Sequence, residues 1–143
     1  GHFDKLNINL FDEGNEILQD YGAVRFISVE QKFGGRYLPE TKKYAMQSIA
    51  HNTLVQNEVS HFKADEDVAE VNNPVLVHNQ LQDSVHLLTV LDTNAYANTK
   101  MLRTIAMLQL PKQQKPLMVD VFSVQGSKQC QYDLPFHYVG QFI

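Results

Sequence analysis

Residues 6–21 read Leu-Asn-Ile-Asn-Leu-Phe-Asp-Glu-Gly-Asn-Glu-Ile-Leu-Gln-Asp-Tyr, and this stretch decides the expected fold. Apolar and polar residues alternate from Leu6 to Leu10, which is typical of a strand that buries one face. Residues 12–15 have the composition of a tight turn, so residues 16–21 are predicted to return as the second strand of a hairpin. The dominant period is therefore two, the period of β-structure.

Similar short strands recur along the chain at intervals of about ten residues. Further strands are predicted at residues 53–59, 74–77, 85–91, 104–110, 117–124 and 131–138. Residues 111–116 and 125–128 read as hairpin connections, residues 65–73 as a polar loop, and only residues 41–49 suggest a helical turn. The pattern predicts an all-β fold, an antiparallel β-sandwich, formed by residues 1–143 as a single domain.

Composition excludes several classes of protein. The 143 residues carry a net charge of −4, so no long-range attraction to nucleic acid or to anionic lipid is expected. No apolar run approaches the roughly 20 residues that span a bilayer. Cys130 is the single cysteine, which excludes an internal disulfide and a cysteine-rich zinc cluster.

The first residues, Gly1-His2-Phe3-Asp4, include no initiator methionine and no signal-like apolar segment. We therefore expect this chain to be a piece of a longer protein, the N-terminal part of which carried any targeting information.

Nucleophilic hydrolase, P-loop and dinucleotide motifs do not occur in the sequence, so the histidines are the informative residues. His2 shares strand parity with Leu6, and Asp20 shares parity with Leu18 on the predicted partner strand. An imidazole and a carboxylate turned inward are costly to bury unless they are paired or bind a metal. With His51 they would make a suitable ligand set for zinc. Because the spacing is long and irregular, isolated hydrogen-bonded histidines are the alternative.

The other polar candidates are weaker. His61 and His78 are predicted to be exposed and His86 to lie on the outer face of a strand, whereas for His137 an approach to a cleft is only the minor alternative. Lys5 and Arg103 are possible carboxylate contacts. The loop of residues 33–43, which contains Gly34-Gly35-Arg36-Tyr37, can carry polar groups toward a ligand or be a long surface connection.

Several ordered blocks resemble the heparinase II/III-like polysaccharide lyases. The blocks are Gly1-His2-Phe3-Asp4-Lys5-Leu6, residues 14–22, Ala50-His51-Asn52-Thr53-Leu54-Val55, Val119-Asp120-Val121-Phe122 and residues 132–138. Arg25-Phe26 and residues 34–40 make the chain most similar to the alginate and oligoalginate lyase branch. The resemblance covers most of the chain. It implies the C-terminal β-sandwich of an enzyme whose N-terminal domain is an α/α toroid.

The resemblance also implies roles for individual residues. His2, Asp20 and His51 match a set that holds a mainly structural zinc ion (Zn²⁺) and shapes the floor of the cleft. Tyr37 matches a cleft residue with a supporting catalytic role, and it also contacts substrate. Arg25 matches a contact for a uronate carboxylate, since a guanidinium donates two parallel hydrogen bonds. Without the resemblance, Arg25 reads as a surface ion-pair partner and Tyr37 as a loop anchor.

One departure from the family pattern matters for activity. The family block usually reads His-Gly-His with an active-site first histidine, whereas this sequence starts at the Gly. The toroid, with the family's Asn-His pair and catalytic tyrosine, is also missing. We therefore expect that the chain alone does not turn over substrate.

The resemblance implies a parent lyase that cleaves a uronate-containing polysaccharide, alginate or oligoalginate, by β-elimination. The implied partners are the acidic polysaccharide, the toroid of the parent chain and, through open apolar edges, a second copy in a homo-oligomer. The implied location is periplasmic or secreted. Two alternatives stay open: a non-catalytic carbohydrate-binding module, which the absence of Trp disfavours, and a purely structural sandwich.

Overall fold

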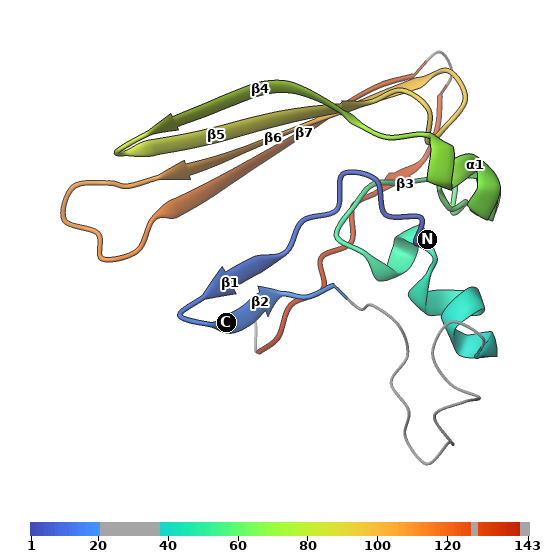
Figure 1. Ribbon diagram of the computed structural model, residues 1–143, viewed down its shortest axis with the longest axis horizontal. Helices are drawn as coiled ribbons and strands as arrows, with labels where there is room; N and C mark the ends of the chain where they lie inside the picture. The colour runs from blue at the N-terminus through green and yellow to red at the C-terminus, as the bar shows by residue number, and fades with distance from the viewer. Residues whose placement is uncertain (21–37, 127–128, 141–143) are drawn as a thin grey trace. The chain divides into compact units, whose positions relative to one another are not determined.

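The computed structural model describes residues 1–20, 38–126 and 129–140 (Figure 1). The chain divides into two compact units: unit 1 comprises Gly1–Val71 and Cys130–Ile143, and unit 2 comprises Asn72–Gln129. Each unit is described by itself. That residues 1–143 act as a single domain stays a prediction.

The predicted hairpin is present in unit 1. Strand β1 (Leu10–Asp12) pairs antiparallel with β2 (Asn15–Leu18), with Glu13 and Gly14 at the turn. Both turn residues have positive φ, 49° at Glu13 and 82° at Gly14, as a two-residue hairpin turn requires. The strand begins at Leu10 and not at residue 6, because Leu6 has a φ of 61° and is buried next to the core with Phe3. Alternation alone therefore predicted the strand too early.

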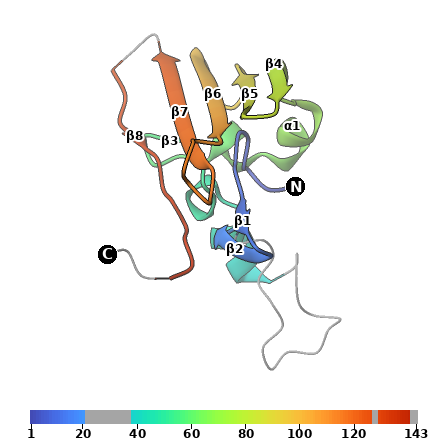
Figure 2. The same ribbon diagram turned by 90° about the vertical axis from the view of Figure 1, so that its left-hand side faces the viewer.

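The rest of unit 1 consists of short elements. A π-helical turn (Thr41–Ala45) and a 3-10 turn (Ser48–Ala50) occupy the segment predicted to be helical. Strand β3 (Val55–Gln56) pairs antiparallel with β8 (Tyr132–Asp133), far away in sequence (Figure 2). A 3-10 turn (His61–Ala64) precedes helix α1 (Glu66–Val71). This helix corrects the prediction of a polar loop at residues 65–73; at six residues it is too short to show a helical period.

Unit 2 is a four-stranded antiparallel meander in the order β4-β5-β6-β7, and Figure 1 shows its strands running along one another. Its strands are β4 (Val75–Gln82), β5 (Val85–Asp92), β6 (Thr99–Leu108) and β7 (Leu117–Gly126). All four were predicted, although β4 and β6 are longer than expected. The predicted connection at residues 111–116 joins β6 to β7, whereas Gln125 and Gly126 still belong to β7.

One face of this sheet contains a buried ion pair. Arg103 on β6 lies directly across from Phe122 and donates to Asp120 on β7, with Nε–Oδ1 at 3.0 Å and Nη2–Oδ2 at 2.5 Å. The guanidinium also lies 5.2 Å from the centre of the Phe122 ring. Arg103 is only 3% exposed, so the idea that it contacts a substrate carboxylate is wrong: its carboxylate partner is internal.

The opposite face of the sheet has exposed apolar side chains along β7. Leu117, Val119 and Val121 alternate along β7 on this face and are all exposed. Their partners on β6, from Thr104 to Leu108, are at most half-buried.

The predicted class, all-β with the antiparallel sheets of a sandwich, is confirmed, since every sheet is antiparallel and the one α-helix in the described residues has six residues. No helix within the described ranges is long and apolar enough to cross a membrane.

Candidate metal centre

Three segments that are far apart in sequence converge in unit 1. His2 comes from the N-terminal segment, Asp20 follows strand β2, and His51 follows the 3-10 turn Ser48–Ala50. One potential ligand atom from each residue lies within 4.8 Å of the other two. Within residues 1–20, 38–126 and 129–140, this is the single group of three or more such side chains that could hold a metal ion.

The His51 ring is oriented by Asp20. Its Nδ1 lies 3.0 Å from the Asp20 Oδ1, and an ionised carboxylate can only accept, so Nδ1–H is the donor. The other ring nitrogen, Nε2, is buried and has no hydrogen-bond partner. Buried polar atoms are nearly always paired, so an unpaired one makes His51 a candidate for binding a ligand.

The environment of His51 favours the neutral ring that a metal requires. Burial lowers the pKa of His51 below its ordinary value of 6.5, and the neighbouring His2 lowers it further. The carboxylates of Asp4 and Asp20 act in the opposite direction, but burial dominates. At neutral pH the unpaired Nε2 therefore has a lone pair to offer. Asp4 was not identified from the sequence as a neighbour of this site. Its position two residues after His2 could have indicated that it lies there.

His2 is held beside His51 by the backbone that follows it. The two rings lie with centroids 5.1 Å apart. The next residue, Phe3, donates its N–H to Met46 O at 2.9 Å and accepts from Ser48 Oγ at 2.5 Å. The segment that carries His2 is therefore tied to the same turn that leads into His51.

His61 was predicted to be exposed, and that prediction is wrong: its side chain is fully buried. Its Nε2 donates to Leu54 O at 2.9 Å and its Nδ1 accepts from the backbone N–H of Lys5 at 3.2 Å. The polar neighbours of His61 in sequence suggested solvent, whereas its partners come from distant segments. Lys5 in turn donates its Nζ to Ala69 O, so in this structure its ammonium is used internally.

The remaining sequence candidates have different outcomes. Arg25 and Tyr37 lie outside the described residues, so their proposed roles stay predictions. His78 and His86 are exposed on β4 and β5, as expected. His137 is half-buried, and its Nε2 lies 2.9 Å from Ile49 O.

The fold and the site together define a β-rich domain with a candidate metal centre made of two histidines and one aspartate. Residues 1–142 match the family described as Heparinase II/III-like, C-terminal, and the chain belongs to this family. The predicted family is thereby confirmed.

Two curated relatives match the whole chain. An exo-oligoalginate lyase from Saccharophagus degradans (strain 2-40) is 43% identical over 143 residues, and an alginate lyase from Stenotrophomonas maltophilia (strain K279a) is 40% identical over the same length. The match covers 100% of this chain and 19% of each relative. The chain therefore spans about a fifth of the length of these relatives, in agreement with the predicted alginate-lyase branch.

Proposed function

We propose that this chain is the zinc-binding C-terminal part of a polysaccharide lyase that acts on a uronate polymer such as alginate or oligoalginate, in the periplasm or outside the cell. The observation that carries the proposal is the convergence of His2, Asp20 and His51, with one potential ligand atom of each within 4.8 Å of the other two. Family membership and the names of the two relatives support the lyase context.

The donor set suits zinc. Two imidazoles and a carboxylate are common zinc ligands, with bonds of about 2.0–2.2 Å, so the three side chains would need only a small contraction from their present separation. The Asp20 carboxylate lies on the Nδ1 side of the His51 ring, with Oδ1 3.0 Å from Nδ1, so these two atoms would bind one ion in place of their hydrogen bond. When bound, the ion would supply a structural cross-link between three loops. We assign no reaction step to it.

The chemistry of the parent enzyme would be β-elimination. That reaction removes the proton beside a carboxylate and expels the glycosidic oxygen, so negative charge grows on the carboxylate and must be stabilised. Arg25 and Tyr37 are proposed to contact the uronate from this chain, while the proton-transferring groups belong to the toroid of the parent protein. The isolated chain should release no unsaturated product from oligoalginate.

The first test is the metal content of the purified chain by elemental mass spectrometry. We expect close to one zinc per chain in the wild type, and loss of that zinc in the Asp20→Ala and His51→Ala variants. His86→Ala is the matched control, because it removes an exposed histidine of unit 2 and should leave the zinc content unchanged.

A wild-type chain that holds no metal even after zinc addition would overturn the zinc assignment. Metal retained equally by Asp20→Ala and by the wild type would show that the ion binds elsewhere.

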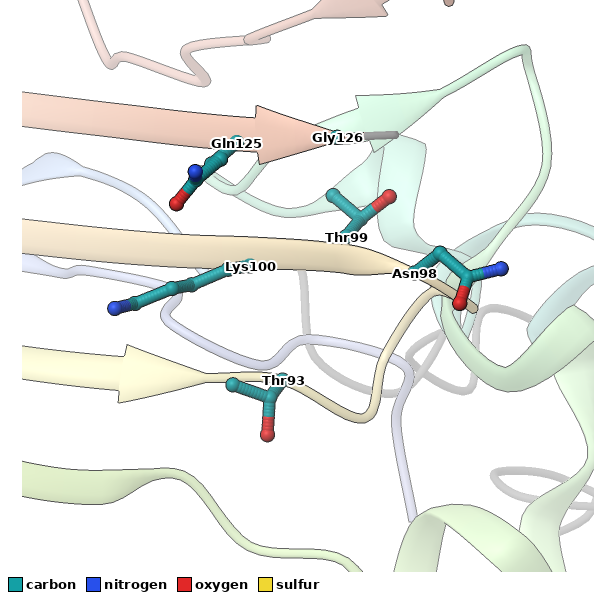
Figure 3. A pocket seen from close by; sticks show the side chains of 6 residues that line it. All are labelled: Thr93, Asn98, Thr99, Lys100, Gln125 and Gly126. Carbon is teal, nitrogen blue, oxygen red and sulfur yellow. The ribbon is translucent and has the colours of Figure 1, made fainter. Parts of the chain in front are cut away.

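A second candidate function, binding of an acidic saccharide, is favoured by a hollow of about 360 Å³ in unit 2. The hollow lies where β6 and β7 pair, and Figure 3 shows the side chains that line it. Lys100 and Gln125 are direct cross-strand partners, and Thr93 lies at the end of β5. Within the described part of the chain, none of these three side chains makes a hydrogen bond or ion pair. An ammonium, an amide and a hydroxyl are thus available to a ligand.

The charge of unit 2 also favours an acidic ligand. Residues 72–129 contain five Lys or Arg and three Asp. Asp120 is paired with Arg103, and Asp92 is buried and accepts from the N–H groups of Asn94 and Ala95. Asp83 is the remaining carboxylate of the unit, and it is exposed near the opposite end of the sheet. Among the side chains that line the hollow, Lys100 is the charged one.

Titration of the chain with oligoalginate, followed by NMR, tests this second function. Binding should shift the backbone signals of residues 98–100 and 125–126, and Lys100→Met should weaken it at least several-fold. Lys112→Met is the matched control, since it removes another exposed lysine of unit 2. Equal binding of a neutral oligosaccharide, or equal weakening by both variants, would argue against a specific acidic-saccharide site.

A further inference from the structure

We propose that Asn52 is the positioning residue of the metal centre: its side-chain amide fixes the backbone beside Asp20 against the backbone beside His51. This inference rests on the proposed zinc site and adds a residue that does not itself contact the ion. Asn52 is fully buried, and both donors and the acceptor of its amide are in use.

The two amide hydrogens of Asn52 join two separate segments. Nδ2 donates to Gln19 O at 2.8 Å, directly before Asp20, and to Ile8 O at 3.0 Å, in the segment that follows His2. The backbone N–H of Asn52 donates to Asn7 Oδ1 at 2.8 Å. Because Asn52 directly follows His51, a single residue connects the backbone next to His51 and Asp20 with residues 7 and 8 of the N-terminal segment.

A closed ring of hydrogen bonds makes this connection rigid. Asn52 Nδ2 donates to Gln19 O, the N–H of Gln19 donates to His137 O at 2.8 Å, and the N–H of His137 donates to Asn52 Oδ1 at 2.6 Å. A primary amide is the one small side chain that offers two donors and an acceptor in a plane. Aspartate has nearly the same shape but, when ionised, only accepts, so it would face two carbonyl oxygens with no hydrogen to offer.

Loss of this ring of hydrogen bonds is expected to change the position of Asp20 relative to His51. With the ring intact, Asp20 Oδ1 is held 3.0 Å from His51 Nδ1. Without it, the chain after β2 is no longer fixed against residue 51, and the carboxylate can move away from the imidazole. Groups that orient metal ligands commonly change metal affinity by about 10–100-fold when they are replaced.

The test compares Asn52→Asp and Asn7→Ala with Thr41→Val, which alters a side chain of unit 1 that is buried to the same degree but makes none of these contacts. Three quantities are measured on the full chain: the zinc dissociation constant by chelator competition, the visible spectrum of the Co²⁺-substituted protein, and the ¹⁵N-resolved imidazole N–H signal of His51 without metal. Melting temperatures of the metal-free proteins give the loss of stability that each variant suffers.

We expect Asn52→Asp to weaken zinc binding by about 10–100-fold and to alter the cobalt spectrum. Asn7→Ala, which removes the contact to the Asn52 backbone and an exposed contact to Asn9 Oδ1, should weaken binding several-fold. Thr41→Val should lower the melting temperature without changing either metal readout. The proposal is overturned if Asn52→Asp binds zinc like the wild type, or if Thr41→Val weakens binding as much for the same loss of stability.

Two further outcomes are also decisive. If Asn52→Asp does not fold, Asn7→Ala decides, and wild-type zinc affinity in that variant overturns the proposal. If the wild type binds no zinc, the proposed function fails, but the His51 imidazole signal still tests the positioning role. A protected N–H that is present in the wild type and lost in Asn7→Ala supports that role, and an unchanged signal overturns it.

Discussion

At the scale of single residues, the burial of His51 predicts how the stability of the metal-free protein depends on pH. Its pKa is lowered in the folded state, so between that lowered value and 6.5 the unfolded chain binds a proton that the folded chain does not. Stability therefore falls as the pH drops below about 6.5 and is constant above it, as far as this group is concerned.

We expect this trend in melting temperatures of the metal-free protein between pH 5 and 8. His2, Asp4 and Asp20 also face His51, so the contribution of His51 is taken as the difference between the wild type and His51→Gln. That difference should shrink as the pH falls. Two parallel curves would mean that His51 is protonated equally in the folded and unfolded states.

The buried pair of Arg103 and Asp120 leads to a second prediction at this scale. Asp120 is 13% exposed and Arg103 is 3% exposed, so removing one partner leaves the other charge in a poorly solvated position. We expect Asp120→Ala to lower the free energy of unfolding by about 3–5 kcal/mol in urea titrations.

The double variant Arg103→Met/Asp120→Leu should be less destabilised than Asp120→Ala, because no unpaired charge remains. Asp83→Ala is the control, since it removes an exposed carboxylate and should change stability by at most about 0.5 kcal/mol. If Asp120→Ala were as mild as this control, the pair would contribute little to stability.

At the scale of elements, the turn between β1 and β2 gives a test of local backbone strain. A Cβ added at Gly14 would meet no atom within 4 Å, so Gly14→Ala changes only the backbone preference at φ 82°. We expect it to cost about 1 kcal/mol of stability. Glu13 has a φ of 49°, and Glu13→Asn should stabilise by about 0.5 kcal/mol, because Asn-Gly suits this turn.

Chemical denaturation of the metal-free variants measures both changes. Gly1→Ala serves as the control, because the added Cβ also meets no atom within 4 Å. A Gly14→Ala variant as stable as this control would mean that the turn can adopt another geometry at no cost.

The elements that the sequence predicted well are those with strong local signals. The hairpin follows from turn chemistry around Gly14, and strands β5 to β7 follow from long apolar alternation. Helix α1 was missed because its signal is one capping contact, from the N–H of Val68 to Asp65 Oδ1 at 3.1 Å, and six residues show no period. The very short strands β3 and β8 lie inside the predicted strands 53–59 and 131–138, but their pairing with each other, which limits their length, was not predicted.

The candidate site was predictable to a different degree. His2, Asp20 and His51 were identified by family resemblance, and the structure brings them together. The strand parity that also suggested His2 and Asp20 does not apply, because neither residue lies in a strand. The buried roles of His61 and Asn52 were not predicted, because their partners are backbone groups of residues far away in the chain, such as Leu54, Lys5 and Gln19. No local pattern in the sequence encodes such contacts.

At the scale of the whole molecule, the division into two units predicts a local effect of zinc. All three proposed ligands belong to unit 1, and none belongs to residues 72–129. At a free zinc concentration of about 100 times its dissociation constant, binding would stabilise the folded state by about 2.7 kcal/mol. Hydrogen exchange should therefore slow within residues 1–20 and 41–64 and change little within residues 75–126.

The same experiment on Asp20→Ala is the control, since zinc should then slow exchange in neither unit. An equal slowing in both units of the wild type would mean that they unfold together as one cooperative body, and the expected local effect would be wrong.

The origin of the ligands in three distant segments also has a consequence for folding kinetics. Asp20 and His51 are separated by 31 positions, and the hydrogen bonds that join their neighbourhoods reach as far as His137. Contacts of such long sequence separation form late, because the chain must close large loops first. An ion held by groups that assemble after the rate-limiting barrier stabilises the native state without stabilising the transition state. Zinc would then leave the refolding rate nearly unchanged and mainly lower the unfolding rate.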